Sequence, residues 1–234
     1  MFAMTRTRAG LFVTGTDTGV GKTYVGAMIA RALRAAGHRV GVYKPAASDC
    51  RRVRGELVSD DAVALWEAAG RPGLLDRVCP QCFSAPLAPH LAARAEGKRL
   101  DPELLRRGLE YWRRRSDVIL VEGAGGLMSP LGDDEYVADL AYEIGVPLVV
   151  VARNALGTIN QTLQTLIAAA TFRDGLEVAG IVLNHPVPPG NDPIIATNRG
   201  ELAARCVPPV LAEVAWNGAD FDRSVNWLAL ARRR

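Results

Sequence analysis

Short hydrophobic runs alternate with longer amphipathic stretches along most of the chain. The runs predict strands at 11–13, 40–43, 118–121, 148–151 and 181–183, with a late edge strand at 210–211. The amphipathic stretches predict helices at 22–36, 60–69, 101–115 and 155–170. Because the strand candidates are continuous aliphatic runs, both of their faces are expected to be buried. The pattern therefore predicts an α/β fold with a doubly wound, mostly parallel sheet and helices on both faces.

Length and composition favour one large domain. At about 150 residues per domain, 234 residues allow one large or two small units, and we expect a single domain over 1–234 with flexible ends at 1–9 and 229–234. The longest aliphatic run, 146–152, contains Pro147 and is far shorter than the roughly 20 residues of a membrane span. No cleavage-site pattern follows the first apolar stretch, so we expect no signal peptide and a cytoplasmic location.

The charged residues also restrict the possible partners. There are 28 Lys and Arg residues against 25 Asp and Glu, and Arg232, Arg233 and Arg234 account for the difference. A nucleic-acid-binding surface needs a basic face, which a neutral body does not provide. Lys22, Lys44 and Lys98 are the only lysines, so a lysine kept in this arginine-rich chain is a candidate for chemistry that a guanidinium cannot perform.

The four cysteines do not form a recognisable framework. Cys79 and Cys82 have the C-x-x-C spacing of redox and zinc sites, but there is no second pair, and Cys50 and Cys206 are isolated in the sequence. The pair lies among prolines rather than at a helix start. We therefore interpret Cys79 and Cys82 as reduced loop thiols rather than as a metal or redox site.

The first predicted strand is followed by a phosphate-binding loop. Residues 15–23 read GTDTGVGKT and lead into a helix, although the strict pattern would place glycine at Thr16 rather than Gly15. Backbone N–H groups of such a loop surround phosphate oxygens at a helix N-terminus. Lys22 would reach the β- and γ-phosphates, and the Thr23 hydroxyl would bind Mg²⁺.

Further polar residues follow other strands, where ligands of parallel sheets bind. Lys44 ends the second strand and is favoured as a second phosphate-facing cation over a surface lysine. Glu122 ends the strand at 118–121 and is a candidate Mg²⁺ ligand. Asp60 and Asp61 open a helix as caps or metal ligands, and spacing alone does not choose between them. Asn184 either pairs with an adenine edge or forms a turn.

Together these motifs resemble the dethiobiotin synthetase family of P-loop ATPases. The matching segments, in family order, are VTGTDT at 13–18, VGKT at 20–23, YKP at 43–45 with Ala47 and Ser48, Asp61-Ala62, APH at 88–90, VEGAGG at 121–126, and Gly180, Val182 and Asn184. The resemblance implies a cytoplasmic, single-domain homodimer that uses ATP, Mg²⁺, CO₂ and 7,8-diaminononanoate. It implies that the cyclic urea of dethiobiotin closes through a carbamate and a carbamic–phosphoric anhydride.

The resemblance also assigns roles to individual residues. It implies ATP contacts by Gly19, Val20, Gly21, Lys22, Thr23, Tyr24, Asp61, Glu122, Gly123, Ala124, Gly125, Asn184, His185, Val214 and Ala215. It implies Thr23, Asp61 and Glu122 as Mg²⁺ ligands, with Asp61 preferred to Asp60 because Ala-x-Ala-Leu follows it. Lys22, Lys44 and Thr18 would be catalytic, and Ser48, Lys44, Gly157 and Asn160 would contact the diamine, with 156–160 reaching the partner subunit's site.

Two other classes of function fit some of these features. One is a related P-loop ATPase that forms amides or acts as a partitioning switch, and the other is a nucleotide-binding regulator without turnover. The sequence shows no nucleophilic cysteine with its own histidine-bearing domain, which an amidotransferase would need. Phosphate release that depends on both diamine and bicarbonate would separate the dethiobiotin synthetase from both alternatives.

Overall fold

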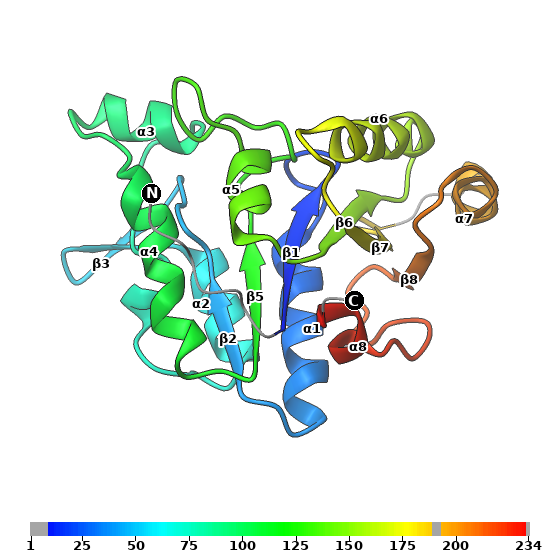
Figure 1. Ribbon diagram of the computed structural model, residues 1–234, viewed down its shortest axis with the longest axis horizontal. Helices are drawn as coiled ribbons and strands as arrows, with labels where there is room; N and C mark the ends of the chain where they lie inside the picture. The colour runs from blue at the N-terminus through cyan, green and yellow to red at the C-terminus, as the bar shows by residue number, and fades with distance from the viewer. Residues whose placement is uncertain (1–8, 189–192, 233–234) are drawn as a thin grey trace.

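A computed structural model describes residues 9–188 and 193–232 of the chain. Its centre is a six-stranded sheet with the order β2-β5-β1-β6-β7-β8 (Figure 1). The strands are β2 (Val40–Tyr43), β5 (Val118–Glu122), β1 (Gly10–Gly15), β6 (Leu148–Arg153), β7 (Val178–Asn184) and β8 (Val210–Val214). Every neighbouring pair runs parallel. This arrangement confirms the predicted parallel sheet and places all carboxyl ends at one edge.

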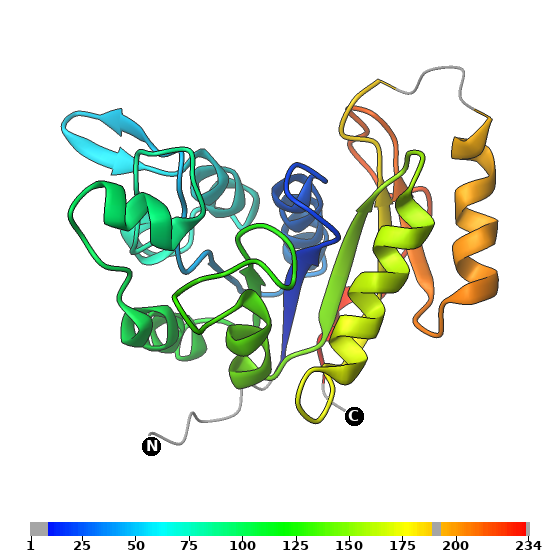
Figure 2. The ribbon, with the colours of Figure 1, turned by 90° about the horizontal axis from the view of Figure 1, so that it is seen from above.

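Helices cover both faces of the sheet (Figures 1 and 2). One face carries α1 (Lys22–Ala35), α2 (Asp60–Ala68) and α8 (Trp227–Ala231), and the other carries α4 (Pro102–Arg113), α5 (Val137–Ile144), α6 (Thr158–Thr171) and α7 (Ile194–Arg205). Right-handed crossovers explain the division, because the chain moves one way along the sheet through α1 and the opposite way through α4 to α7. The two layers confirm the doubly wound fold.

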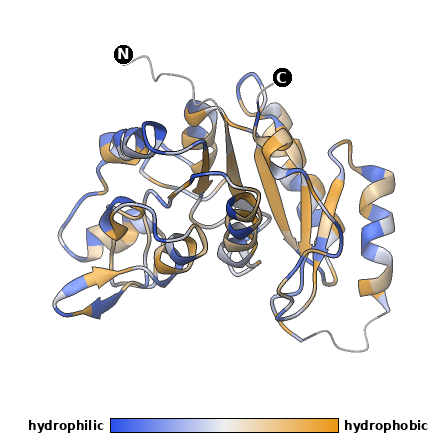
Figure 3. Cartoon of the chain, turned by 90° about the horizontal axis from the view of Figure 1, so that it is seen from below, coloured by the Kyte–Doolittle hydropathy of each residue, from blue (hydrophilic) through white to orange (hydrophobic). Residues whose placement is uncertain are grey.

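The core lies between the sheet and these helices. All residues of β1, β2 and β5 are buried, as are the first five of β6. Figure 3 shows hydrophobic residues along the strands and mixed faces on the outer helices. Because both faces of each strand are covered, aliphatic side chains are needed at successive positions rather than at alternate ones.

Local capping explains where several helices begin. The Asp101 carboxylate accepts hydrogen bonds from the backbone of residues 103 and 104, so α4 starts at Pro102. The Ser59 hydroxyl accepts one from Ala62, so α2 starts at Asp60. The helix expected from residue 155 begins only at Thr158, because Gly157 takes a left-handed conformation with φ of 92°. His90 is the second residue of α3 (Pro89–Ala95), whose N-cap is Ala88.

Several elements were not predicted from the sequence: α3, α5, α7, α8, a short 3-10 helix η1 (Leu75–Arg77), and the antiparallel hairpin of β3 (Arg51–Val53) and β4 (Glu56–Val58). The hairpin turns through Arg54 and Gly55, both with positive φ. Arginine is not one of the residues that usually mark such a turn, so the hairpin has only a weak sequence signal.

The two ends differ from the expected flexible segments. Ala9 is buried beside β1. Residues 229–231 belong to α8, where Trp227 and Ala231 pack into the main core, so the chain is ordered beyond the expected boundary. Residues 1–8 and 233–234 lie outside the described residues. Within the described ranges, no helix has both the length and the apolar character needed to cross a membrane.

Candidate active site

The loop between β1 and α1 has the backbone geometry of a phosphate-binding loop. Gly19 and Gly21 have φ values of 73° and 92°, and Gly21 caps α1. A side chain at Gly15 would place its Cβ 2.7 Å from Val20 Cγ2. Close packing within the loop therefore requires glycine at position 15, whereas Thr16 occupies the position that is glycine in the strict sequence pattern.

Lys22 points back into this loop. Its ammonium donates a hydrogen bond to the backbone oxygen of Asp17 at 3.0 Å, and 7% of the residue is exposed. Burial lowers the Lys22 pKa, the charge of Glu122 raises it, and the charge of Lys44 lowers it again, with a net decrease. The ammonium is thus held where phosphate oxygens would lie in a P-loop.

Lys44 joins the P-loop to two acidic residues. Its Nζ lies 2.5 Å from Glu122 Oε1 and 2.9 Å from Asp61 Oδ2. The Thr23 hydroxyl donates a hydrogen bond to the same Glu122 oxygen at 2.8 Å. These four side chains come from α1, α2, the end of β5 and the residue after β2. The structure therefore brings together the residues that the sequence separated by up to 99 positions.

The charges of this cluster support one another. Burial opposes the charged form of Lys44, but Glu122 and Asp61 outweigh it and raise the Lys44 pKa. Burial likewise opposes ionisation of Asp61, but Lys44 and Thr23 outweigh it and lower the Asp61 pKa. At neutral pH the Lys44 ammonium and the Asp61 carboxylate are therefore both charged.

The two adjacent aspartates have different surroundings. Asp61 contacts Lys44, whereas Asp60 pairs with Arg51 of the β3–β4 hairpin at 2.5 Å and its side chain is 71% exposed. Ser59, not either aspartate, caps the helix. The geometry thus places Asp61 in the cluster and Asp60 outside it, as the family resemblance implied.

The donor set fits a hard divalent cation. Glu122 Oε2 is buried and has no hydrogen-bond partner, so one carboxylate oxygen is available to a ligand. Thr23, Asp61 and Glu122 offer hydroxyl and carboxylate oxygens, the ligands that Mg²⁺ prefers. The described residues contain no group of three His, Cys, Asp or Glu residues arranged to hold a metal. Phosphates and water would therefore have to complete a Mg²⁺ shell, as is usual for this ion.

The glycine-rich segment after β5 packs against the P-loop. Gly125 has φ of 76°, and a Cβ there would lie 2.2 Å from the Ser129 hydroxyl and 3.6 Å from that of Thr18. A Cβ at Gly126 would lie 3.4 Å from the backbone oxygen of Gly15. Gly125 and Gly126 therefore lie against the P-loop, with Gly125 next to the exposed Thr18, whereas Gly123 faces Phe12 and Val137. The predicted contacts of residues 123–125 with ATP stay predictions.

Asn184 lies directly behind Gly21. Its side chain is buried and donates a hydrogen bond through Nδ2 to the backbone oxygen of Val20 at 2.8 Å. A Cβ at Gly21 would come 2.0 Å from Nδ2. Asn184 Oδ1 is buried without a partner. The turn interpretation therefore does not account for this side chain, which supports the P-loop and leaves one acceptor atom free.

A buried polar network lies next to Asn184 and was not predicted. Glu213 Oε1 lies 2.7 Å from His185 Nε2 and accepts a hydrogen bond from Asn154 Nδ2 at 2.8 Å. Asn198 donates to Asn154 Oδ1 at 2.8 Å. The four residues belong to β8, to α7 and to the segments that follow β6 and β7. No local sequence pattern connects them, because only the fold brings them together.

The remaining nucleotide candidates lie at the same edge. Val214 ends β8, and its backbone oxygen accepts a hydrogen bond from the His185 backbone at 3.0 Å. The Tyr24 hydroxyl donates to the backbone oxygen of Gly218 at 2.9 Å, in the loop that begins with the exposed Ala215. Tyr24, His185, Val214 and Ala215 therefore flank the P-loop on the β7–β8 side.

The predicted substrate residues fall into two places. Ser48 is half-buried in the segment that continues from Lys44. Gly157 and Asn160 are exposed at the start of α6, after β6. The hydrogen bonds and ion pairs of the Lys44 cluster within the described residues do not include Gly157 or Asn160. Within one chain, the structure groups Ser48 with Lys44 and leaves the α6 residues at the surface.

Known protein families and individual proteins are similar to this chain over most of its length. A family model described as an AAA domain matches residues 9–219. The chain is 43% identical over 214 residues to the ATP-dependent dethiobiotin synthetase of Rhodopirellula baltica, covering 87% of this chain and 82% of that protein. It is 46% identical over 207 residues to the protein of the same name from Anaeromyxobacter dehalogenans, covering 88% and 90%.

Solved structures with similar folds are more distant in sequence. The signal recognition particle receptor FtsY from Elizabethkingia anophelis matches with a TM-score of 0.55 and 18% identity, and the alignment covers 98% of this chain and 66% of that one. The MinC:MinD cell division protein complex from Aquifex aeolicus matches with a TM-score of 0.51 and 14% identity, covering 88% and 81%. These similarities concern the fold alone, whereas the sequence relatives show that the chain belongs to the ATP-dependent dethiobiotin synthetase family.

Proposed function

We propose that this chain is an ATP-dependent dethiobiotin synthetase, a cyclo-ligase of biotin biosynthesis. Its substrates would be 7,8-diaminononanoate, CO₂ and ATP, and its products dethiobiotin, ADP and phosphate. The single observation that carries this proposal is the position of Lys44, whose ammonium contacts Glu122 and Asp61 beside the P-loop. A second buried lysine at the phosphate site suits a reaction that joins two anions.

The reaction needs positive charge at the point where the anions meet. One amine of the diamine adds to CO₂ and loses a proton, which gives a carbamate. A carbamate oxygen then attacks the γ-phosphorus of ATP, the bond to ADP breaks, and a carbamic–phosphoric anhydride forms. The second amine then attacks the activated carbon, closes the cyclic urea and releases phosphate. Repulsion between carbamate and triphosphate is large at low dielectric. Lys22 on the P-loop side and Lys44 on the β2 side are placed to offset it.

Each charged residue has a distinct part in this scheme. Lys22 would orient the β- and γ-phosphates, and Lys44 would hold the carbamate next to the γ-phosphate. When bound, Mg²⁺ would offset phosphate charge, and Thr23, Asp61 and Glu122 are the residues that would hold it. Glu122 also keeps Lys44 charged, because its carboxylate lies against the ammonium. Ser48 would contact the diamine from the segment that follows Lys44.

The β7–β8 side of the P-loop is proposed as the adenine site. Asn184 Oδ1 is a buried acceptor without a partner and can accept a hydrogen bond from an exocyclic amino group. The exposed loop after β8 begins with Ala215 and contacts Tyr24 through Gly218. His185 directly follows Asn184, and its ring is hydrogen-bonded to Glu213. We therefore expect it to position the end of β7 beside the adenine rather than to contact the base itself.

A homodimer and a cytoplasmic location complete the proposal. Leu156 and Ile167, before and within α6, are 77% and 62% exposed, which supports contact with a second subunit through this helix. Gly157 and Asn160 lie on the same exposed segment and would reach the partner's substrate tail. All four cysteines are free, as expected for a protein in a reducing compartment.

One assay tests the proposed function. Purified protein is supplied with ATP, Mg²⁺, the diamine and bicarbonate, and phosphate release is followed together with dethiobiotin formation by mass spectrometry. We expect both products in equal amounts and neither when the diamine or bicarbonate is omitted. Phosphate release that ignores the diamine would indicate a partitioning-type ATPase, and nucleotide binding without release would indicate a regulator.

A further inference from the structure

Three of the four cysteines gather beside the segment that carries Lys44. Cys79 and Cys82 have their Sγ atoms 3.6 Å apart. Cys50, which is isolated in the sequence, also contacts Cys82 through its thiol. Cys206 lies elsewhere, at the end of α7. All four cysteines are free thiols in the structure, and the fold brings Cys50, which is isolated in the sequence, next to the Cys79–Cys82 pair.

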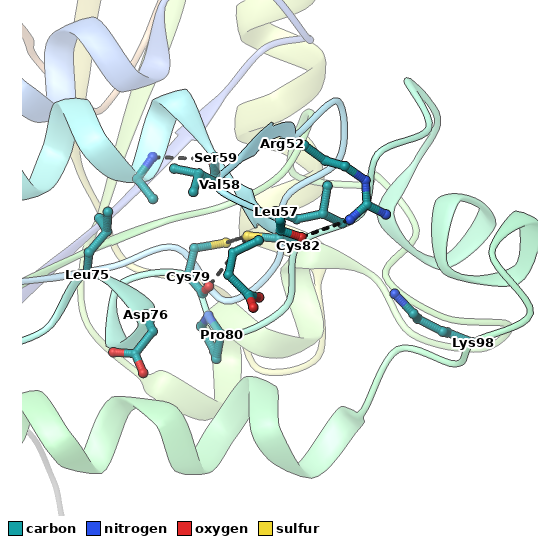
Figure 4. A pocket seen from close by; sticks show the side chains of 13 residues that line it. Arg52, Leu57, Val58, Ser59, Leu75, Asp76, Cys79, Pro80, Cys82 and Lys98 are labelled. Atoms are coloured by element: carbon teal, nitrogen blue, oxygen red, sulfur yellow. Dashed lines mark hydrogen bonds between the residues drawn. The ribbon is translucent and has the colours of Figure 1, made fainter.

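The thiol pair can be reached by small molecules. A cavity of about 650 Å³ is lined by Cys79, Cys82 and the β3–β4 hairpin. Figure 4 shows the two sulfurs facing each other in this pocket, with Arg52 on one side and Lys98 farther out. No residue of the P-loop lines the cavity, although Ser59 and Ala62 at the start of α2 do. It therefore gives access to the thiols without passing through the phosphate site.

The cysteine segment is bonded to the Lys44 segment along its whole length. The backbone N–H of Lys44 donates to Val78, and that of Ala47 donates to Gln81, at 2.8 and 2.9 Å. The N–H groups of Phe83 and Cys50 donate to Ala47 and Phe83, each at 2.9 Å. A change in the backbone at 79–82 is thus transmitted to the residues on either side of Ser48.

We propose that Cys79 and Cys82 form a redox-sensitive modification site. A low-molecular-weight disulfide that enters the cavity converts the pair into an intramolecular disulfide, and this shifts the Lys44–Ser48 segment. Closing the bond would shorten the distance between the two sulfur atoms from 3.6 Å to about 2.05 Å, and the backbone hydrogen bonds at 78, 81 and 83 would pass any accompanying backbone adjustment to the Lys44–Ser48 segment.

The oxidation is an ordinary thiol–disulfide exchange. One cysteine thiolate attacks the added disulfide RSSR, forms a mixed disulfide and releases RS⁻. The second cysteine sulfur attacks the mixed disulfide, closes the Cys79–Cys82 bond and releases a second RS⁻. The two protein thiols lose two protons and two electrons, and the added disulfide is reduced to two thiols. A dithiol reductant reverses the exchange.

The surroundings of Cys82 make the exchange slow. A hydrogen bond with Cys50 lowers the Cys82 pKa, but contact with Cys79 and burial raise it by more, to about 12. Contact with Cys82 and, second, burial also raise the Cys50 pKa. Because the thiolate is the attacking form, attack by Cys82 is expected to be slow, and long incubations with the oxidant are needed.

Mass spectrometry tests the modification directly and without any activity measurement. The full-length protein is incubated with excess oxidised glutathione, and the peptide containing residues 79–82 is analysed. We expect it to lose two hydrogen atoms and to regain them with dithiothreitol. The Cys206→Ser variant should behave like the wild type, and the Cys79→Ser and Cys82→Ser variants should not form the bond. A wild-type peptide that keeps its mass, or carries only glutathione, overturns the proposal.

A second measurement tests the link to Lys44. Turnover of the oxidised protein should fall roughly tenfold or more, because small displacements of catalytic groups are costly, and it should recover on reduction. The Cys79→Ser variant should show no response to the oxidant, whereas Cys206→Ser should respond like the wild type. A disulfide that forms with turnover unchanged overturns the structural link. If the protein has no dethiobiotin synthetase activity, the mass measurement still decides whether the site exists.

Discussion

Lys44 and Glu122 form an ion pair that is almost excluded from solvent. The ammonium nitrogen lies 2.5 Å from Oε1 of the carboxylate, and only 5% and 2% of the two side chains are exposed. Removing two charges from water is costly, so a buried ion pair is weak evidence for stability. We infer that the pair serves binding rather than stability. The ammonium would bind an anionic substrate group, and the carboxylate would bind a cation.

Gly21 is expected to be more sensitive to substitution than Gly19. Both have positive φ, so alanine at either position strains the backbone by about 1–3 kcal/mol. At Gly21 the added Cβ would also lie 2.0 Å from Asn184 Nδ2, whereas at Gly19 nothing lies within 4 Å. We expect Gly21→Ala to lose most ATP binding in calorimetry and Gly19→Ala to lose distinctly less. Equal losses would mean that the Asn184 contact is unimportant.

Asp61 and Asp60 offer a matched pair for the metal site. Asp61 contacts Lys44, while Asp60 pairs with Arg51 at the surface. We expect Asp61→Asn to raise the Mg²⁺ concentration needed for half-maximal turnover by at least tenfold, since loss of a carboxylate weakens a hard-cation site. Asp60→Asn should leave it near the wild-type value. A larger effect of Asp60→Asn than of Asp61→Asn in the Mg²⁺ titration would show that Asp61 is not the metal ligand.

The pKa of Asp61 predicts how stability changes in acid. Burial opposes its charge, but Lys44 outweighs this and holds the pKa below 3.8. A depressed folded-state pKa gives stability that is present above the unfolded value and is lost as the pH falls through the folded value. We expect the free energy of unfolding, measured in urea, to fall less between neutral pH and about pH 3 in Asp61→Asn than in the wild type. Equal losses contradict the Asp61 assignment.

The buried side chain of Trp112 in α4 is expected to stabilise the folded protein strongly. It is 1% exposed, and its indole N–H donates to the backbone oxygen of Arg77 at 3.1 Å. Trp112→Ala should cost about 3–5 kcal/mol in the free energy of unfolding. Trp216→Ala, at a 42% exposed position, is the control and should cost less than about 1 kcal/mol. Similar costs in urea denaturation would show that the α4 packing is misjudged.

The sequence predicted the parallel sheet and the P-loop because both leave local signals. The continuous aliphatic runs of β5 and β6 indicate strands that are covered on both faces. The Gly21-Lys22-Thr23 sequence marks the start of a helix, with Gly21 as the N-cap of α1. Lys44 and Glu122 were recognisable because each follows a strand. Their common position at the carboxyl edge then follows from the parallel topology.

The parts that were missed depend on contacts between distant segments. Asp60 and Asp61 could be separated only by the family resemblance, because Arg51 binds Asp60 across a hairpin turned by Arg54 at positive φ. The Cys50 and Cys82 thiols meet because backbone hydrogen bonds align their segments. The network around Glu213 joins four elements, and none of its members has a spacing pattern that would mark it.

The role of Lys44 is tested most directly by single-turnover formation of dethiobiotin in the Lys44→Ala variant, with ATP affinity measured in parallel. We expect ATP to bind almost as in the wild type and the rate to fall about a hundredfold, because a preorganised charge at the transferring phosphoryl group is removed. Lys44→Arg should fail to restore the rate, since a planar guanidinium does not replace a compact ammonium. Lys98→Ala, an exposed lysine paired with Glu96, is the control and should react normally. A Lys44→Ala variant that forms dethiobiotin at the wild-type rate would contradict the proposed mechanism.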